Sequence, residues 1–108
     1  MGRKARPLPK YLAEKLCRIR ATLGFSQNEI VAKMGLDDLL DRSRVSEFEA
    51  GAEPPLIVLL RYSELANVTV NVLIDDNLDL PAALPSSQRS EGIPRQGAKK
   101  AGRKRSSS

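Results

Sequence analysis

Residues 26–51 read SQNEIVAKMGLDDLLDRSRVSEFEAG, and this stretch decides the fold because it predicts two short helices joined by a turn. Ser26 is the expected cap of the first helix, and Glu29, three residues later, completes the pattern of a capping box. Gly35 is expected to end this helix, because glycine adopts the left-handed conformation of a helix stop without strain. The first helix is therefore predicted between residues 26 and 35.

The second helix of the stretch is predicted to begin after Asp41, a good capping residue, and to end near Glu49. Val45 and Phe48 are three residues apart, so they share one side of this helix and are expected to anchor it in the core. A glycine and two prolines follow and prevent its continuation. Between the two helices, residues 36–40 predict either a lengthened turn or an extra half-turn of helix.

Length and composition restrict the class of protein. The 108 residues suit one small domain, and a single cysteine excludes an intrachain disulfide, which is typical of a cytoplasmic location. The chain has no histidine, so the lone thiol cannot build a zinc site, and we expect no metal and no other cofactor. No run approaches the roughly 18 apolar residues of a membrane span. Without a nucleophile beside a base, or a phosphate-cradling loop, the chain is not expected to be an enzyme.

The net charge of +5 is unevenly distributed along the chain. Residues 1–9 have a net charge of +3, residues 10–80 have 8 basic and 12 acidic groups, and residues 81–108 have 7 basic groups and 1 acidic group. The central part is thus acidic, while the two ends are basic and can attract polyanions without sequence preference. We predict a disordered basic arm over residues 1–9, a helical domain over 10–80 and a disordered basic tail over 81–108, because the tail has too little apolar surface to offset its ordering entropy.

Three further helices are predicted around the central stretch. The first covers residues 10–23, where apolar residues recur at the helical period. A fourth covers residues 56–66, and a short fifth runs from a Thr69 cap to about residue 75. The inner face of the fourth helix is expected to comprise Leu56, Leu59, Leu60, Ser63 and Ala66.

The segments SQNEIVAKMG and VSEFEAG resemble the phage-repressor and Cro-like (Xre-type) helix-turn-helix family, over about residues 10–76. The resemblance implies an all-α, five-helix lambda-repressor-like domain that regulates transcription. Such a protein is nucleoid-associated, binds double-stranded DNA, usually as a homodimer, and reads the major groove with its third helix.

The resemblance also implies roles for individual residues. Gln27 matches the position that touches a DNA phosphate and supports the recognition helix. Glu49 matches an acid that pairs with an arginine of the first helix, here Arg20. The base-reading positions of the family fall on Arg42, Ser43 and Glu47, and Arg44 is able to reach a base edge or the DNA backbone.

The residue chemistry supports some of these roles independently. Arg42 can offer two donors to the two acceptors of guanine, and Ser43 is short enough to let a helix approach the bases. Ser26 and Gln27 form a helix N-terminus, which binds phosphate through free amides. The alternative for Arg42 and Arg44 is surface pairing with the neighbouring aspartates, and the alternative for Gln27 is a plain solvent-facing position.

Four apolar residues predict either a dimer surface or ordinary core. They are Ile57, Val58, Leu73 and Ile74. Two other functions compete with the sequence-specific regulator. One is a protein-interaction module of the same fold, such as an antitoxin or an adaptor, that uses the acidic face of the third helix. The other is a nonspecific nucleic-acid binder that depends on the basic tail.

Overall fold

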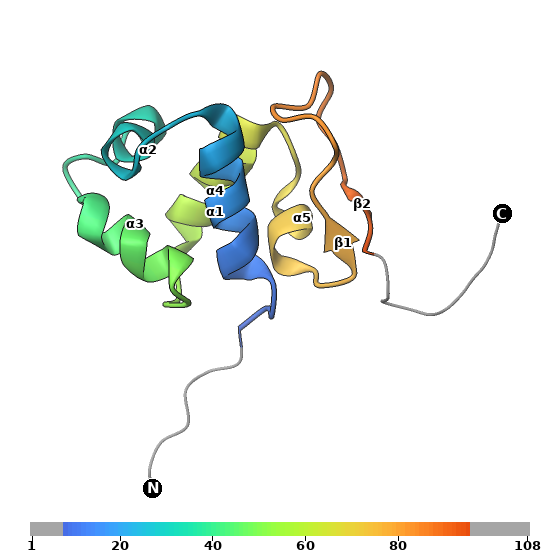
Figure 1. Cartoon of the computed structure of the whole chain (residues 1–108), viewed down its shortest axis with the longest axis horizontal. Coiled ribbons are helices and arrows are strands. Elements are labelled where there is room, and N and C mark those ends of the chain that lie inside the picture. Colours follow the sequence, from blue (N-terminus) through green and yellow to red (C-terminus); the bar gives the residue numbers. More distant parts are fainter. Residues whose placement is uncertain (1–7, 96–108) are drawn as a thin grey trace, which may run out of the picture.

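The computed structural model of the chain describes residues 8–95, and helix α1 (Leu12–Leu23) lies in the middle of this part (Figure 1). Helices α2 and α3 lie on one side of α1, and α5 and two short strands lie on the other (Figure 1). The remaining elements are α2 (Gln27–Met34), α3 (Arg42–Glu49), α4 (Leu56–Ala66), α5 (Val70–Ile74), β1 (Leu78–Asp79) and β2 (Ile93–Pro94).

The caps predicted for α2 and α3 are confirmed. The Ser26 hydroxyl accepts the Glu29 N–H at 3.0 Å, and the Glu29 carboxylate accepts the Ser26 N–H at 2.7 Å. The Asp41 carboxylate caps α3 by accepting the backbone N–H groups of Ser43 and Arg44. Residues 36–40 form a single hydrogen-bonded turn rather than a continuation of helix.

The core is apolar and draws on every helix. Val45 and Phe48 are fully buried and anchor α3, as predicted. The apolar residues of α1 that recur at the helical period are Leu12, Leu16, Ile19 and Leu23, and all are buried except Leu23, which is partly buried. The largest of the other fully buried apolar side chains are Leu16, Ile19, Ile30, Tyr62, Leu73 and Leu80.

The predicted inner face of α4 is partly wrong. Leu56 is 84% exposed and Leu60 is 38% exposed, whereas Val58 and Tyr62 are fully buried together with Ser63. The helix is apolar on nearly all sides, so its hydrophobic period does not define one face.

Of the four residues predicted as either dimer surface or ordinary core, two belong to the core. Val58 and Leu73 are fully buried among the helices of one chain, so they are unavailable to a second copy. Ile57 and Ile74 keep 37% and 42% of their surface exposed.

A buried lysine joins α1 to α5. Lys15 has no exposed surface, and its ammonium donates to the carbonyl of Val72 at 2.7 Å and to that of Asp75 at 3.1 Å. These carbonyls belong to the C-terminal end of α5, where a cation is electrostatically favoured. Burial lowers the pKa of Lys15, because its charged form is desolvated.

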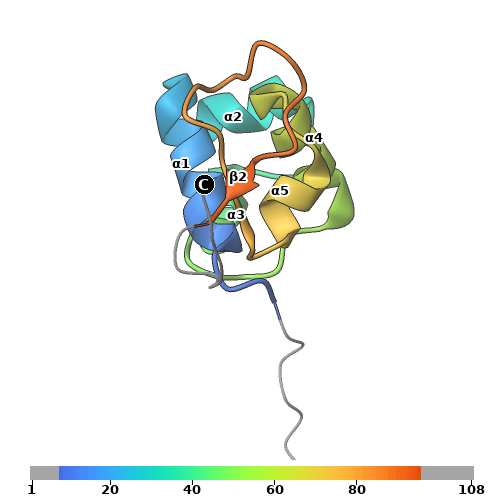
Figure 2. The same ribbon diagram turned by 90° about the vertical axis from the view of Figure 1, so that its right-hand side faces the viewer.

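The prediction that the chain is disordered from residue 81 onward is wrong for residues 81–95, called the strap below. The strap returns along the domain (Figure 2), and β2 pairs antiparallel with β1 (Figure 1). The Thr69 N–H donates to the Ser90 carbonyl at 2.8 Å, and the Ser86 N–H donates to the Ala66 carbonyl at 3.0 Å. Backbone hydrogen bonds thus hold a segment that has few apolar side chains. The fold is therefore mostly helical with a two-stranded sheet, rather than purely helical.

The other predicted disordered positions, residues 1–7 and 96–108, lie outside the described residues.

A substitution at Gly92 tests how closely the strap packs against the rest of the domain. Its φ is +84°, and a Cβ atom there would lie 2.7 Å from the Asp79 carbonyl oxygen and 2.9 Å from a methyl group of Val72. We expect Gly92→Ala to lower the free energy of unfolding by about 2–3 kcal/mol, through backbone strain plus overpacking.

Gly24 is the matched control, because its φ is +80° and nothing lies within 4 Å of an added Cβ atom. Gly24→Ala should therefore cost only the backbone strain of about 1–2 kcal/mol. Urea denaturation measures both losses, and equal losses would mean that the strap does not press on Val72.

Candidate nucleic-acid interface

Helix α3 presents a polar face to solvent at the edge of the molecule away from the strap (Figure 1). Its two buried residues, Val45 and Phe48, point into the core, so the polar residues between them point outward. The capping carboxylate of Asp41 fixes where the helix begins. The exposed side chains of α3 include Arg42, Ser43, Arg44, Ser46 and Glu47.

The start of α2 meets this face. Gln27 lines a shallow surface hollow together with Arg42, Ser43 and Ser46. The predicted contact residues of α2 and α3 are thus brought together in part, whereas Arg44 and Glu47 do not line the hollow. Ser46 was missed by the sequence analysis, although its position four residues after Arg42 places it on the same side of the helix.

The two arginines of α3 differ in their side-chain contacts. The Arg44 guanidinium donates to Glu47 at 2.6 Å and lies 5.2 Å from the ring centre of Phe48, so it is folded along the helix. The Arg42 side chain makes no hydrogen bond or ion pair with any other residue of the described range 8–95. Neither arginine pairs with the neighbouring aspartates, which was the alternative predicted from the sequence.

The helix termini differ in their free donors. At α3, the Asp41 carboxylate accepts the N–H groups of Ser43 and Arg44. The Ser43 hydroxyl also donates to this carboxylate, at 2.6 Å. These hydrogen bonds lower the pKa of Asp41, and the bond from the Ser43 hydroxyl has the largest effect. At α2, the capping box uses the amide and hydroxyl of Ser26, so the predicted phosphate donor role does not fit the Ser26 N–H. The first-turn amides of α2 without an intrahelical partner belong to Gln27 and Asn28.

An ion pair fixes α3 against α1. The Arg20 guanidinium donates two hydrogen bonds to the Glu49 carboxylate, at 2.6 and 3.0 Å, and a third to the Phe25 carbonyl at 3.0 Å. The Gln27 amide donates to the same carboxylate at 3.3 Å. The Arg20–Glu49 pair predicted from the sequence is therefore confirmed, and Gln27 is tied to the end of α3 rather than free in solvent.

The ion pair is largely shielded from water, because the side chains of Arg20 and Glu49 are 20% and 10% exposed. Burial disfavours the charged form of Glu49, but the hydrogen bonds from Arg20 and Gln27 outweigh it and lower the pKa of Glu49. The hydrogen bond to Glu49 in turn raises the pKa of Arg20. Both groups are therefore charged near neutral pH.

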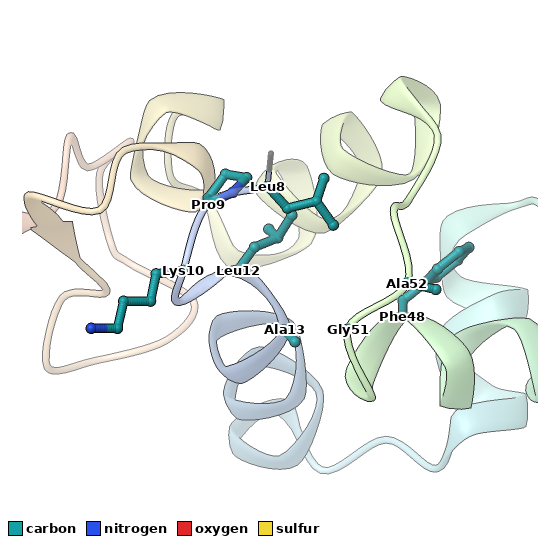
Figure 3. Close-up of a pocket in the computed structure, with 8 residues that line it drawn as sticks. All are labelled: Leu8, Pro9, Lys10, Leu12, Ala13, Phe48, Gly51 and Ala52. Carbon is teal, nitrogen blue, oxygen red and sulfur yellow. The ribbon is translucent and has the colours of Figure 1, made fainter. Parts of the chain in front are cut away.

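A second hollow lies where the chain enters the fold. Leu8, Pro9 and Leu12 face Phe48, Gly51 and Ala52 across it, while Lys10 points away (Figure 3). Residues just before α1 thus lie opposite the end of α3.

Comparison with known proteins identifies no relative: no protein-family model, no curated protein and no solved structure matches this chain. Within residues 8–95, no cluster of acidic, cysteine or histidine side chains has a geometry suited to a metal ion. No helix in this range combines the length and hydropathy needed to cross a bilayer.

The ion pair predicts a specific dependence of stability on pH. Glu49→Gln leaves Arg20 without a counter-charge in a shielded position, so we expect the free energy of unfolding at pH 7 to fall by about 2–3 kcal/mol. Since the folded-state pKa of Glu49 is lowered, its stabilising effect is present above the unfolded pKa of about 4.3 and is lost as the pH falls through the folded value.

Urea denaturation at pH 7 and at about pH 3 checks this expectation. The control is Glu47→Gln, which removes a 54% exposed carboxylate from the Arg44 pair and should change stability by less than about 0.5 kcal/mol. A difference between wild type and Glu49→Gln that is the same at both pH values would contradict the assignment.

Proposed function

We propose that this protein is a sequence-specific DNA-binding transcriptional regulator that reads the major groove with α3, like the Xre-type helix-turn-helix proteins that its sequence resembles. The observation that carries the proposal is the hollow in which Gln27 of α2 meets Arg42, Ser43 and Ser46 of α3. A helix whose apolar side is anchored in the core and whose polar side is open can enter a groove about 12 Å wide.

Each residue at this face has a distinct role in the proposal. Arg42, whose side chain pairs with no other residue among 8–95, donates to the two acceptors of guanine. Ser43 and Ser46 are short, so they let the helix approach the base edges. Gln27 and Asn28 contribute backbone amides to a phosphate, as helix N-termini commonly do. Arg44 offsets the charge of Glu47, which otherwise repels the DNA backbone.

A homodimer remains part of the proposal, but with a different surface. Leu56, Ile57 and Leu60 are exposed on the first turns of α4, where a second copy can cover them. A twofold dimer presents two copies of α3 to two half-sites, which is the usual arrangement for helix-turn-helix proteins.

Arg42 is predicted to determine the sequence that is selected. Duplexes bound by the full chain are enriched from a random pool and sequenced, for the wild type and for Arg42→Ala. We expect the variant to lose selection at one base pair, equivalent to about 1–3 kcal/mol, because a bidentate contact to guanine is removed.

The control for this experiment is Arg89→Ala, which removes an equal charge from an exposed position of the strap. It should leave the selected sequence unchanged. If Arg42→Ala and Arg89→Ala select the same sequence as the wild type, α3 does not read bases through Arg42.

Leu56→Lys tests the dimer surface. We expect it to shift the chain toward monomer in sedimentation equilibrium, because a charge would be buried in the contact. The melting temperature of the monomer should not fall, since Leu56 is 84% exposed. Leu39→Lys is the control, because Leu39 is also exposed, at 71%, but lies in the turn before α3. Equal self-association of the two variants would contradict the α4 dimer.

A second candidate function is a protein-interaction module, such as an antitoxin or an adaptor. It is favoured by the exposed Leu39, which lies with Asp37, Asp38 and Asp41 around a surface hollow beside α3. An apolar side chain among carboxylates suits a cationic protein segment and repels phosphates. Failure of the random pool to yield any enriched sequence would favour this function.

A further inference from the structure

The turn between α2 and α3 presents one apolar side chain to solvent at the outer edge of the molecule (Figure 1). Leu39 is 71% exposed, whereas Leu36 is buried and Leu40 packs against the core. The Leu36 carbonyl accepts the backbone N–H groups of Leu39 and Leu40, at 2.8 and 2.9 Å, so the turn has a defined shape. A leucine on a fixed turn loses little conformational freedom when it contacts another surface, which favours binding at this position.

Carboxylates surround this exposed leucine. Asp37, Asp38 and Asp41 line a shallow hollow together with Leu39. No lysine or arginine among residues 8–95 forms an ion pair with any of the three aspartates. Arg44 also lines the hollow, but its guanidinium is paired with the glutamate of α3 that lies three residues further on. The hollow around Leu39 therefore has negative charge that the fold does not neutralise.

The chemistry of the hollow restricts its ligand. Phosphates are repelled by the carboxylates, and no group of acidic side chains in the described part of the chain is suited to hold a metal ion. A ligand that fits has cations to pair with the aspartates and an apolar group to cover Leu39. A protein segment supplies both on neighbouring side chains, since charge complementarity orients the segment and the apolar contact stabilises it.

The hollow around Leu39 adjoins the face that is proposed to read DNA. Ser43, the second residue of α3, lines this hollow and also the hollow in which α2 meets α3. The two hollows therefore meet at the start of α3. A duplex that receives α3 in its major groove brings the phosphates at the groove edges to this position. A protein segment bound around Leu39 occupies space that the duplex needs.

We propose that the hollow around Leu39 binds a segment of another protein in which basic side chains flank an apolar one, and that this segment and DNA exclude each other. The exclusion rests on the proposed function, because the competing ligand is the duplex that α3 reads. The aspartates disfavour a phosphate backbone at this edge and attract a cationic segment. Binding of the segment therefore releases the protein from DNA.

The first experiment determines which peptide chemistry the hollow accepts. A random peptide pool displayed on phage is selected on the immobilised full chain, and phage that also bind the Leu39→Ser variant are discarded. We expect the remaining peptides to have lysine or arginine on both sides of an apolar residue. A pool that is empty after the second step, or that shows no excess of basic residues, would overturn the inference.

The contribution of the aspartates is measured with the most enriched peptide. The turn variant combines Asp37→Asn with Asp38→Asn, and the control variant combines Glu64→Gln with Glu91→Gln. Both variants lose two negative charges from exposed positions, but only the first loses them from the hollow. In fluorescence anisotropy we expect the turn variant to bind the peptide about three- to thirtyfold more weakly than the wild type, and the control variant to bind it within about twofold. Equal losses would overturn the inference, because the peptide would then be attracted by the acidic fold as a whole.

The second experiment measures competition with DNA. The peptide is added to the full chain bound to a labelled duplex that contains the selected site. We expect the peptide to displace the duplex from the wild type at a concentration near its own Kd, and from the turn variant only at a correspondingly higher concentration. Equal displacement from both proteins would mean that the peptide competes by binding the duplex, and it would overturn the exclusion.

The outcomes separate this inference from the proposed function. Peptide binding that depends on the aspartates supports the docking surface even if no duplex is enriched from the random DNA pool, in which case the function proposed for α3 fails. Failure of the peptide selection overturns the inference and leaves sequence selection by α3 intact. A complex that contains both peptide and duplex in analytical ultracentrifugation also overturns it, because the two ligands would then not share the start of α3.

Discussion

The orientation of α3 depends on the Arg20–Glu49 ion pair. This helix has eight residues, which is too short to be stable alone, and only Val45 and Phe48 anchor it in the core. Two buried side chains three residues apart define the buried side of the helix but do not by themselves fix its direction. Glu49 directly follows Phe48, and its carboxylate binds both Arg20 of α1 and Gln27 of α2. One carboxylate therefore sets the relative positions of three helices and of the polar face between them.

Local signals in the sequence predicted the helices well. The capping residues Ser26 and Asp41 act within three residues, so their effect does not depend on the rest of the fold. The buried face of α4 was predicted less well, because a helix reading LIVLLRYSELA is apolar on most sides and only packing selects Tyr62 over Leu60. Lys15 had a usable signal, since it falls on the apolar face between Leu12 and Ile19, where a charged residue requires buried acceptors.

The disorder predicted from composition is wrong for the strap, residues 81–95, and the hydrogen bonds of the strap explain why. Few apolar side chains suggest disorder when burial is the only stabilising term considered. Residues 81–95 instead use backbone groups that the helices leave available, such as the Ala66 carbonyl at the end of α4. The contact of Arg95 with Tyr11 joins positions at opposite ends of the described chain, so no periodicity within either segment could have predicted it. The charge distribution was readable from the sequence, but the meeting of the two ends was not.

The arrangement of charge on α3 bears on how affinity and specificity are divided in the proposed function. Asp41 is committed to capping, and Arg44 is paired with Glu47, so of the two arginines on this helix Arg42 alone is open to a base. A face with one open cation among several carboxylates gains little from counterion release. Strong attraction by α3 itself would also favour every sequence equally, because phosphates are the same in all of them. In the proposed function, a fold with this charge distribution therefore suits a helix α3 that discriminates between sequences rather than one that supplies strong attraction to every duplex.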